Sequence, residues 1–129
     1  MTRYEVKGTK STPYMFFQDG RLEIRGISIT DNSIQLFDPL MKIVKDYCMM
    51  PYEETVINFH LDFLNSGTMR RIINLLLLFN QLHNKGHKII VNWYYTHEIE
   101  DILDAGNIIR SLLEMPVNLV LDVLDPVSQ

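Results

Sequence analysis

The sequence has 129 residues, 47% of them hydrophobic and 22% charged, a composition typical of one globular domain over residues 1–129. Its net charge of −4 and the lack of a long apolar run argue against a protein that binds nucleic acid through the phosphate backbone or spans a membrane. The single cysteine, Cys48, excludes an internal disulfide and favours a reducing cytoplasm.

The first predicted element is a hairpin of two strands. Apolar and polar residues alternate over residues 14–17 and 21–29. Between them lie Asp19 and Gly20, and the glycine can adopt the positive φ angle that a tight turn needs. We therefore expect an antiparallel pair of strands close to the N-terminus.

A helix is expected next, from the capping residues 31–33 to about Met49. Its apolar residues recur every three or four positions. Pro39 interrupts this pattern and leaves two alternatives: one helix kinked at Pro39, or a short helical turn before a helix that Asp38 caps. The apolar positions are Leu36, Phe37, Leu40, Met41, Val44 and Tyr47.

Three later segments, residues 56–63, 88–95 and 118–123, alternate apolar and polar residues and are predicted to be half-buried strands. Parallel strands covered on both faces have continuous apolar runs, so the alternation favours a sheet with helices on one face and the other face open. The apolar face of the first strand carries Ile57, Phe59, Leu61 and Phe63, that of the second Ile89, Val91, Trp93 and Tyr95, and that of the third Leu119, Leu121 and Val123.

Two further helices are predicted between these strands, over residues 68–84 and 98–114. The resulting order, β-β-α-β-α-β-α-β, predicts an α/β fold. It has a small mixed sheet with an N-terminal antiparallel hairpin, parallel pairs after it, and about three helices packed on one face. The apolar stripe of the last helix comprises Ile99, Ile102, Leu103, Ile109, Leu112 and Leu113.

Charge is distributed unevenly along the chain. Residues 1–25 carry five basic and three acidic residues, whereas residues 97–129 carry one basic and seven acidic residues. The acidic C-terminal third either serves solubility or suits a basic protein partner.

The histidines offer little chemistry. His83 and His87 have the spacing of a helical metal pair, but Gly86 separates them at the predicted helix end, and no third ligand is evident. His60 and Asp62 share one strand face, either as an acid–base pair or as part of a hydrated surface. No glycine-rich phosphate loop occurs. We therefore expect no metal and no cofactor.

The turn before the second predicted helix is the most informative segment. Ser66 and Thr68 lie at the start of that helix, where unpaired backbone N–H groups and the helix dipole stabilise an anion. Phosphorylation of either hydroxyl would therefore be tolerated, and Arg70 and Arg71 follow within one helical turn. The alternative is an ordinary helix cap in this segment, since Ser, Thr and Asn are preferred capping residues, with Thr68 as the cap or a residue of the first turn.

Three segments carry a resemblance to a known family. They are Gly8–Pro13 (GTKSTP), Asp31–Phe37 (DNSIQLF), and Leu64–Thr68 (LNSGT) ahead of Met69 and Arg70. Together they resemble the SiaC-type bacterial regulatory phosphoproteins over nearly the whole chain, and more distantly the STAS-type anti-sigma factor antagonists. In the latter a strand ends in an Asp-Ser pair whose serine is phosphorylated. Asn65 and Ser66 occupy those two positions.

The resemblance implies a STAS-like domain that acts as a non-enzymatic partner switch in cyclic di-GMP signalling and biofilm regulation. The unphosphorylated protein would bind and activate a diguanylate cyclase, a Ser/Thr kinase would phosphorylate it, and a PP2C-like phosphatase would restore it. Ser66 would be the phosphate acceptor, with Thr68 as the rival. The SiaC motif has threonine at the position of Ser66 and a hydroxyl residue at that of Gly67.

Other residues are assigned by the same resemblance. The surface around the phosphate acceptor would comprise Asn65, Gly67, Thr68 and Arg70. The Gly8–Pro13 segment is either a lead-in to a strand or a docking surface that uses Thr9, Ser11 and Thr12.

Two other functions stay open. The first is a constitutive protein-interaction module that uses the open sheet face without phosphorylation. The second is a small hydrolase or transferase that uses His60 and Asp62. Exposed edge strands permit a monomer or a weak homodimer.

Overall fold

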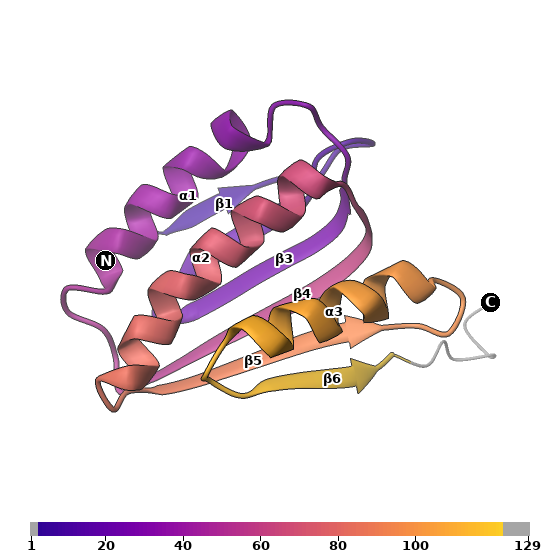
Figure 1. Cartoon of the computed structure of the whole chain (residues 1–129). Helices are drawn as coiled ribbons and strands as arrows, with labels where there is room; N and C mark the ends of the chain where they lie inside the picture. Colours follow the sequence, from indigo (N-terminus) through magenta and orange to yellow (C-terminus); the bar gives the residue numbers. More distant parts are fainter. Residues whose placement is uncertain (1–2, 123–129) are drawn as a thin grey trace, which may run out of the picture.

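The computed structural model describes residues 3–122, which form a six-stranded mixed sheet and three helices (Figure 1). The strands follow one another across the sheet in the order of the sequence. None of the helices in this part of the chain is long and apolar enough to cross a membrane. The elements are β1 (Tyr4–Val6), β2 (Tyr14–Gln18), β3 (Arg21–Ser28), α1 (Ser33–Tyr47), β4 (Glu54–Leu64), α2 (Ser66–Asn84), β5 (Lys88–Tyr95), α3 (Glu100–Leu112) and β6 (Val117–Leu121).

The predicted hairpin is confirmed. β2 and β3 pair antiparallel through the turn Asp19-Gly20, and both turn residues have positive φ angles, 52° and 77°. Two such residues match the right-handed twist of the flanking strands. The short strand β1 pairs antiparallel with β2 and was absent from the sequence prediction. Three residues are too few to show an alternating pattern.

The rest of the sheet is parallel, as predicted. β3, β4, β5 and β6 pair in this order, and a helix connects each to the next. Figure 1 shows all three helices over the same face of the sheet. The residues buried under them alternate along every central strand, for example Ile57 and Phe59 on β4 and Val91 and Trp93 on β5.

The open face is polar along its middle row. Asn118 donates a side-chain hydrogen bond to Asn92 (3.0 Å), Asn92 donates to Asn58 (2.9 Å), and Asn58 lies 3.5 Å from Glu23. These residues occupy register positions on β6, β5, β4 and β3. The row gives the amide groups partners on a face that no helix covers.

α1 is one continuous helix through Pro39, so the alternative of a separate helical turn is wrong. Pro39 and Gln35, whose carbonyl lies one turn earlier, are both exposed, so water can reach the carbonyl that the proline leaves without a donor. Asn32 occupies the cap position, but its side chain makes no capping hydrogen bond. The helix ends at Tyr47, two residues before the predicted end.

The phase of β4 changes near its end. Gly26 is paired with Leu61, whereas Ile27 is paired with Phe63, so Asp62 is an extra residue on β4. This bulge turns the following side chains over. Phe63 was predicted to face the core but is 52% exposed, and Leu64 packs against the core instead.

The stripe predicted for the last helix is right at Ile102 and Ile109 and wrong at Leu112, which is 54% exposed. The buried row continues from Ile109 to Leu113 after the helix, and this leaves Leu112 outside. The last strand ends at Leu121, where the side chain is 38% exposed. Its predicted end, Val123, lies outside the described residues.

Gly106 allows α3 to approach the sheet closely. A Cβ atom on Gly106 would lie 2.5 Å from Cδ1 of the buried Trp93 and 2.8 Å from Leu119 Cδ2. The Trp93 ring cannot retreat easily, because its Nε1 donates a hydrogen bond to the carbonyl of Ile102 (2.7 Å). The glycine is therefore required by packing.

We predict that Gly106→Ala lowers the free energy of unfolding by about 1–2 kcal/mol. Overpacking costs about 1–3 kcal/mol and outweighs the roughly 1 kcal/mol that alanine adds to helix propensity. Urea unfolding followed by fluorescence of Trp93, the single tryptophan, measures the change. Asn107→Ala, on the exposed side of the same helix, is the control and should change stability by less than about 0.5 kcal/mol. Equal stability of the two variants would contradict the packing argument.

Candidate functional site

The Ser66 turn, defined as residues 65–68, lies where β4 ends and α2 begins. Asn65 is the helix cap, since its Oδ1 accepts a hydrogen bond from the backbone N–H of Thr68 (2.9 Å). Its Nδ2 donates to the carbonyl of Thr30 (3.0 Å), and its backbone N–H donates to the carbonyl of Ser28 (3.0 Å). The cap is thus Asn65, and Thr68 lies in the first turn of α2.

The two candidate hydroxyls have opposite surroundings. Thr68 is fully buried; its Oγ1 lies 2.6 Å from Ser28 Oγ and donates to the carbonyl of Ser28 (3.2 Å). Ser66 is the first residue of α2 and is exposed. Of the two, only Ser66 offers its hydroxyl to an enzyme without local unfolding.

Gly67 brings the starts of two helices together. A Cβ atom on Gly67 would lie 2.8 Å from Oγ of Ser33, the first residue of α1. This close approach accounts for glycine where the resemblance predicts a hydroxyl residue. Neither helix has an acidic residue in its first turn, so nothing there offsets the partial positive charge of the two helix ends.

Two arginines follow the turn on α2. Arg70, one helical turn after Ser66, is exposed. Arg71 is partly buried, and within residues 3–122 its Nε has no hydrogen-bond partner. Arg70 is therefore the more accessible cation close to Ser66.

The Gly8–Pro13 loop is attached to the same end of the sheet. The Thr9 hydroxyl accepts hydrogen bonds from the backbone N–H groups of Ser11 (3.2 Å) and Thr12 (3.0 Å), and the Ser11 carbonyl accepts one from Ile29 (2.9 Å). Ile29 lies between Ser28 and Thr30, the two residues that hold Asn65. The structure thus assembles all three segments of the resemblance at one place.

Exposed apolar side chains flank the Ser66 turn. Ile29 is 51% exposed, Ile34 61% and Phe63 52%. Ile29 follows Ser28, which is hydrogen-bonded to the turn, and Ile34 follows Ser33, which lies against Gly67. Phe63 precedes Leu64, the residue before the turn. Large exposed apolar side chains on segments that meet at one place are typical of an interaction surface.

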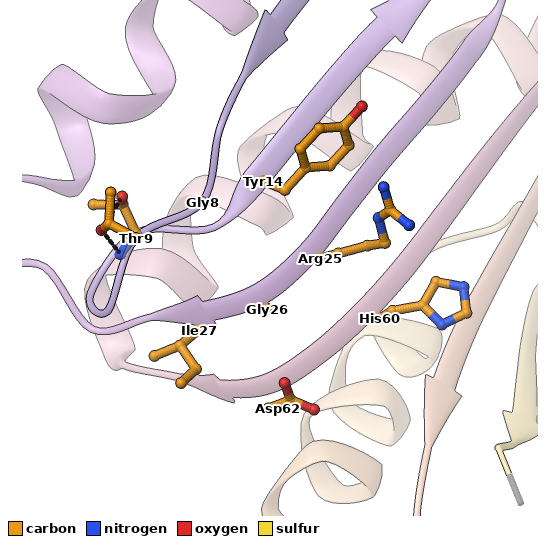
Figure 2. Close-up of a pocket in the computed structure, with 9 residues that line it drawn as sticks. Gly8, Thr9, Tyr14, Arg25, Gly26, Ile27, His60 and Asp62 are labelled. Atoms are coloured by element: carbon orange, nitrogen blue, oxygen red, sulfur yellow. Dashed lines mark hydrogen bonds between the residues drawn. The ribbon is translucent and has the colours of Figure 1, made fainter. Parts of the chain in front are cut away.

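His60 and Asp62 are not brought together as an acid–base pair. The His60 ring stacks on Tyr94, with centroids 3.8 Å apart, and its Nδ1 lies 3.8 Å from Oδ2 of Asp122. Figure 2 shows His60 and Asp62 apart along β4, where the bulge separates them. The arrangement lacks the contact that general acid–base catalysis by this pair requires.

Both residues line a broad hollow on the open sheet face. We call it the open-face depression and define it by Thr9, Thr12, Tyr14, Arg25, His60 and Asp62. Its volume is about 540 Å³, and Figure 2 shows it from the side of the strands.

The other histidines form no metal site. His83 lies in the last turn of α2, and His87 precedes β5. In the described part of the chain, no three His, Cys, Asp or Glu side chains are grouped to hold a metal ion.

Sequence reasoning missed that Ser28 and the carbonyl of Thr30 hydrogen-bond the turn and that Ser33 lies against Gly67. Ser28 and Ser33 are buried polar residues, and Ser28 ends a strand whose apolar pattern predicts only that it faces inward. Nothing local to residues 28–33 indicates a bond to residues 65–68. The one signal in the sequence is Ser28 itself, because a polar residue at an inward-facing strand position needs a hydrogen-bond partner.

A family model and several known proteins match the chain. The model of the SiaC family regulatory phosphoproteins matches residues 6–121. An uncharacterized protein of Pseudomonas aeruginosa (strain UCBPP-PA14) is 25% identical over 118 residues, which cover 90% of this chain and 94% of that protein.

Two solved structures from Pseudomonas aeruginosa share the fold. The crystal structure of apo-SiaC has a TM-score of 0.86 at 22% identity and covers 93% of this chain and 99% of its own. SiaC in the crystal structure of the diguanylate cyclase SiaD with its activator SiaC has a TM-score of 0.83 at 23% identity, over 92% of this chain and 99% of its own. The predicted small mixed sheet with helices on one face is therefore confirmed.

We predict that Asn65→Ala lowers the free energy of unfolding by about 1–2 kcal/mol, because the helix loses its cap and Thr30 loses a donor. Asn65→Asp keeps the capping oxygen and should lose less. Chemical denaturation measures both. Asn74→Ala, on the exposed face of the same helix, is the control, with an expected change below about 0.5 kcal/mol. An Asn65→Ala variant as stable as the control would show that the cap does not hold the turn.

Proposed function

The chain belongs to the SiaC family of regulatory phosphoproteins, and we propose that it is a non-enzymatic switch in which phosphorylation of Ser66 controls the docking of a protein partner. One observation carries this proposal. Ser66 is exposed, whereas the rival Thr68 is fully buried and its hydroxyl lies 2.6 Å from Ser28 Oγ.

The unphosphorylated turn suits a partner. Ile29, Ile34 and Phe63 belong to the segments that meet at the turn and are exposed, and burial of apolar area in a complex contributes roughly 25 cal/mol per Å². A neutral serine hydroxyl can be covered at small cost if it finds a hydrogen-bond partner. A partner that covers the apolar side chains therefore also covers Ser66.

Phosphate changes this balance. It adds a charge of about −1.5 to −2 at a position that the partner must desolvate. In the free protein the starts of α1 and α2 lie together at Gly67, and each helix end stabilises an anion by roughly 0.3–1 kcal/mol. Arg70 provides a further cation one turn away. Phosphorylation thus favours the free state over the complex.

The kind of partner follows from the family. In the related structure, SiaC is the activator of the diguanylate cyclase SiaD. We propose a diguanylate cyclase as the effector of this chain, together with a Ser/Thr kinase and a PP2C-like phosphatase that act on Ser66 in opposite directions. Such a kinase consumes ATP, which places the proposed switch in the cytoplasm.

The remaining residues of the turn have supporting roles in this proposal. Asn65 fixes the backbone of the acceptor, Gly67 keeps α1 and α2 in contact, and Thr68 anchors the first helical turn. Arg70 faces the phosphate or the partner. Thr9 and Thr12 hold the neighbouring loop in shape, and Ser11 ties it to β3.

We predict that the unphosphorylated chain and Ser66→Ala bind the cyclase equally, while Ser66→Asp and the phosphorylated chain bind at least tenfold more weakly, about 1.4 kcal/mol. Calorimetric titration of the purified cyclase measures the affinities. Fragment-mass spectrometry of the chain from its own cells, with and without a PP2C-type phosphatase, locates the phosphate.

Two results would overturn the switch as proposed. A phosphate on Thr68 would move the acceptor to a residue that must first leave the core. Equal binding of all four forms would instead indicate a constitutive interaction module.

We also predict that Phe63→Ala lowers the affinity for the cyclase at least tenfold, because it removes apolar area beside Ser66. Leu112→Ala is the matched control, since Leu112 on α3 is as exposed, 54% against 52% for Phe63. Both variants should unfold within about 0.5 kcal/mol of the wild type. If the two variants lose affinity equally, the docking surface does not lie at the Ser66 turn.

A further inference from the structure

We propose that the open-face depression is a second docking surface, which takes an acidic segment of a partner protein. It lies on the face of the sheet that the helices leave uncovered, and the phosphate-controlled turn described above does not include it. Its volume of about 540 Å³ and its broad opening suit a side chain or two of a docked segment.

The floor of the open-face depression is a row of side chains that pack against one another. Tyr14, Arg25 and His60 are in register on β2, β3 and β4. The guanidinium carbon of Arg25 lies 4.5 Å from the centroid of the Tyr14 ring, and the His60 ring stacks on Tyr94. Figure 2 shows Arg25 between Tyr14 and His60. A cation held against an aromatic face loses little entropy on binding.

Arg25 is available to a carboxylate from outside. Within residues 3–122 no carboxylate lies within ion-pair distance of its guanidinium. Glu23, two residues earlier on the same face, has Oε1 3.5 Å from Asn58 Nδ2, and within the described residues its buried Oε2 has no hydrogen-bond partner. Asp62 lines the depression without reaching Arg25. Arginine beside an aromatic ring is a frequent centre of protein interfaces.

Glu5 is already engaged. It accepts a hydrogen bond from the Tyr14 hydroxyl (2.7 Å) and pairs with Arg3 (2.9 Å). These contacts, that of Tyr14 first, lower the pKa of Glu5, and the bond to Glu5 raises the pKa of Tyr14. Tyr14 therefore keeps its proton at neutral pH, and its ring stays a neutral support for Arg25.

One wall is the Gly8–Pro13 loop, which its own hydrogen bonds keep in shape. Thr9 and Thr12 pair through backbone (2.8 Å) and side chains (2.6 Å), and both line the depression. Lys7 and Lys10 lie exposed at and beside this loop. A docked acidic segment would meet hydroxyl groups and two further cations at this wall.

The distribution of charge on the sheet indicates the charge of the docked segment. The strands follow the chain across the sheet, so residues 3–25, with five basic and three acidic residues, make up one side of it and include Arg3, Lys7 and Arg25. The other side has the acidic helix α3 and the uncharged strand β6, which Asp122 follows. A chain with a net charge of −4 thus has a cationic side, which attracts acidic segments and repels basic ones.

None of residues 65–68 lines the depression, and this gives the surface a use of its own. A phosphatase must bind the phosphorylated chain, and a kinase must bind the unphosphorylated one. A docking surface away from Ser66 serves both states. The proposal about the depression does not depend on which enzyme uses it.

The test is an NMR titration of the ¹⁵N-labelled chain with a short peptide in which Glu alternates with Leu. We expect amide shifts at Thr9, Thr12, Arg25 and His60, equal in the wild type and Ser66→Asp, and affinity lowered at least tenfold by Arg25→Glu. Arg110→Glu, at an exposed position on α3, is the matched control and should bind as the wild type. Amide shifts of both variants that match the wild type away from the substituted residue confirm that the variants are folded.

Other outcomes would overturn the proposal. Equal shifts with a peptide that has Gln in place of Glu would remove the charge argument. The same shifts with inorganic phosphate would assign the depression to free anions. Shifts that depend on the concentration of the chain alone would assign it to a second copy, and no shift up to about 1 mM peptide would exclude a useful affinity. None of these results changes the expected effect of Ser66→Asp on cyclase binding, so the two proposals can fail separately.

Discussion

The contact between Ser28 and Thr68 determines which side chains of the Ser66 turn face the solvent. Both side chains are buried, their oxygens lie 2.6 Å apart, and the Ser28 carbonyl also accepts the backbone N–H of Asn65. In an α-helix, residues two apart point in directions that differ by about 200°. Once Thr68 is held against the end of β3, Ser66 must point outward. A bond inside the protein therefore selects which of two neighbouring hydroxyls meets solvent.

Much of the fold follows from local patterns. The hairpin turn at Asp19-Gly20, the alternation of β4 and β5, and the apolar periodicity of α2 each arise within a few residues of chain, and they suffice for the mixed sheet with one open face. The predictions are wrong where contacts with another strand determine which way a side chain points. Phe63 has the alternation of a core residue, but a bulge against Gly26 of β3 turns it outward. The alternation of residues within β4 cannot predict this bulge, because the bulge depends on the pairing with β3.

The candidate site also has features that the local sequence predicts and features that depend on residues far away in the chain. The small hydroxyl residues around Ser66 and their place before a helix can be recognised in the sequence, and the family resemblance selects Ser66. Local sequence cannot distinguish Ser66 from Thr68, because both are good residues at a helix start. The distinction depends on Ser28, 40 residues away from Thr68. Likewise, the reason for Gly67 is the proximity of Ser33, which belongs to another helix.

The order of the strands has a consequence for how the chain is made. Each strand pairs with the strand before it in the sequence, from β1 to β6. No strand is inserted between two others, so every new strand meets an edge that already exists when it leaves the ribosome. Sequential pairing keeps the loops to be closed short, which lowers the entropy lost before contacts form. The sheet can thus grow in one direction during synthesis, and β4, with the residues that fix the Ser66 turn, joins before β5 and β6 are complete.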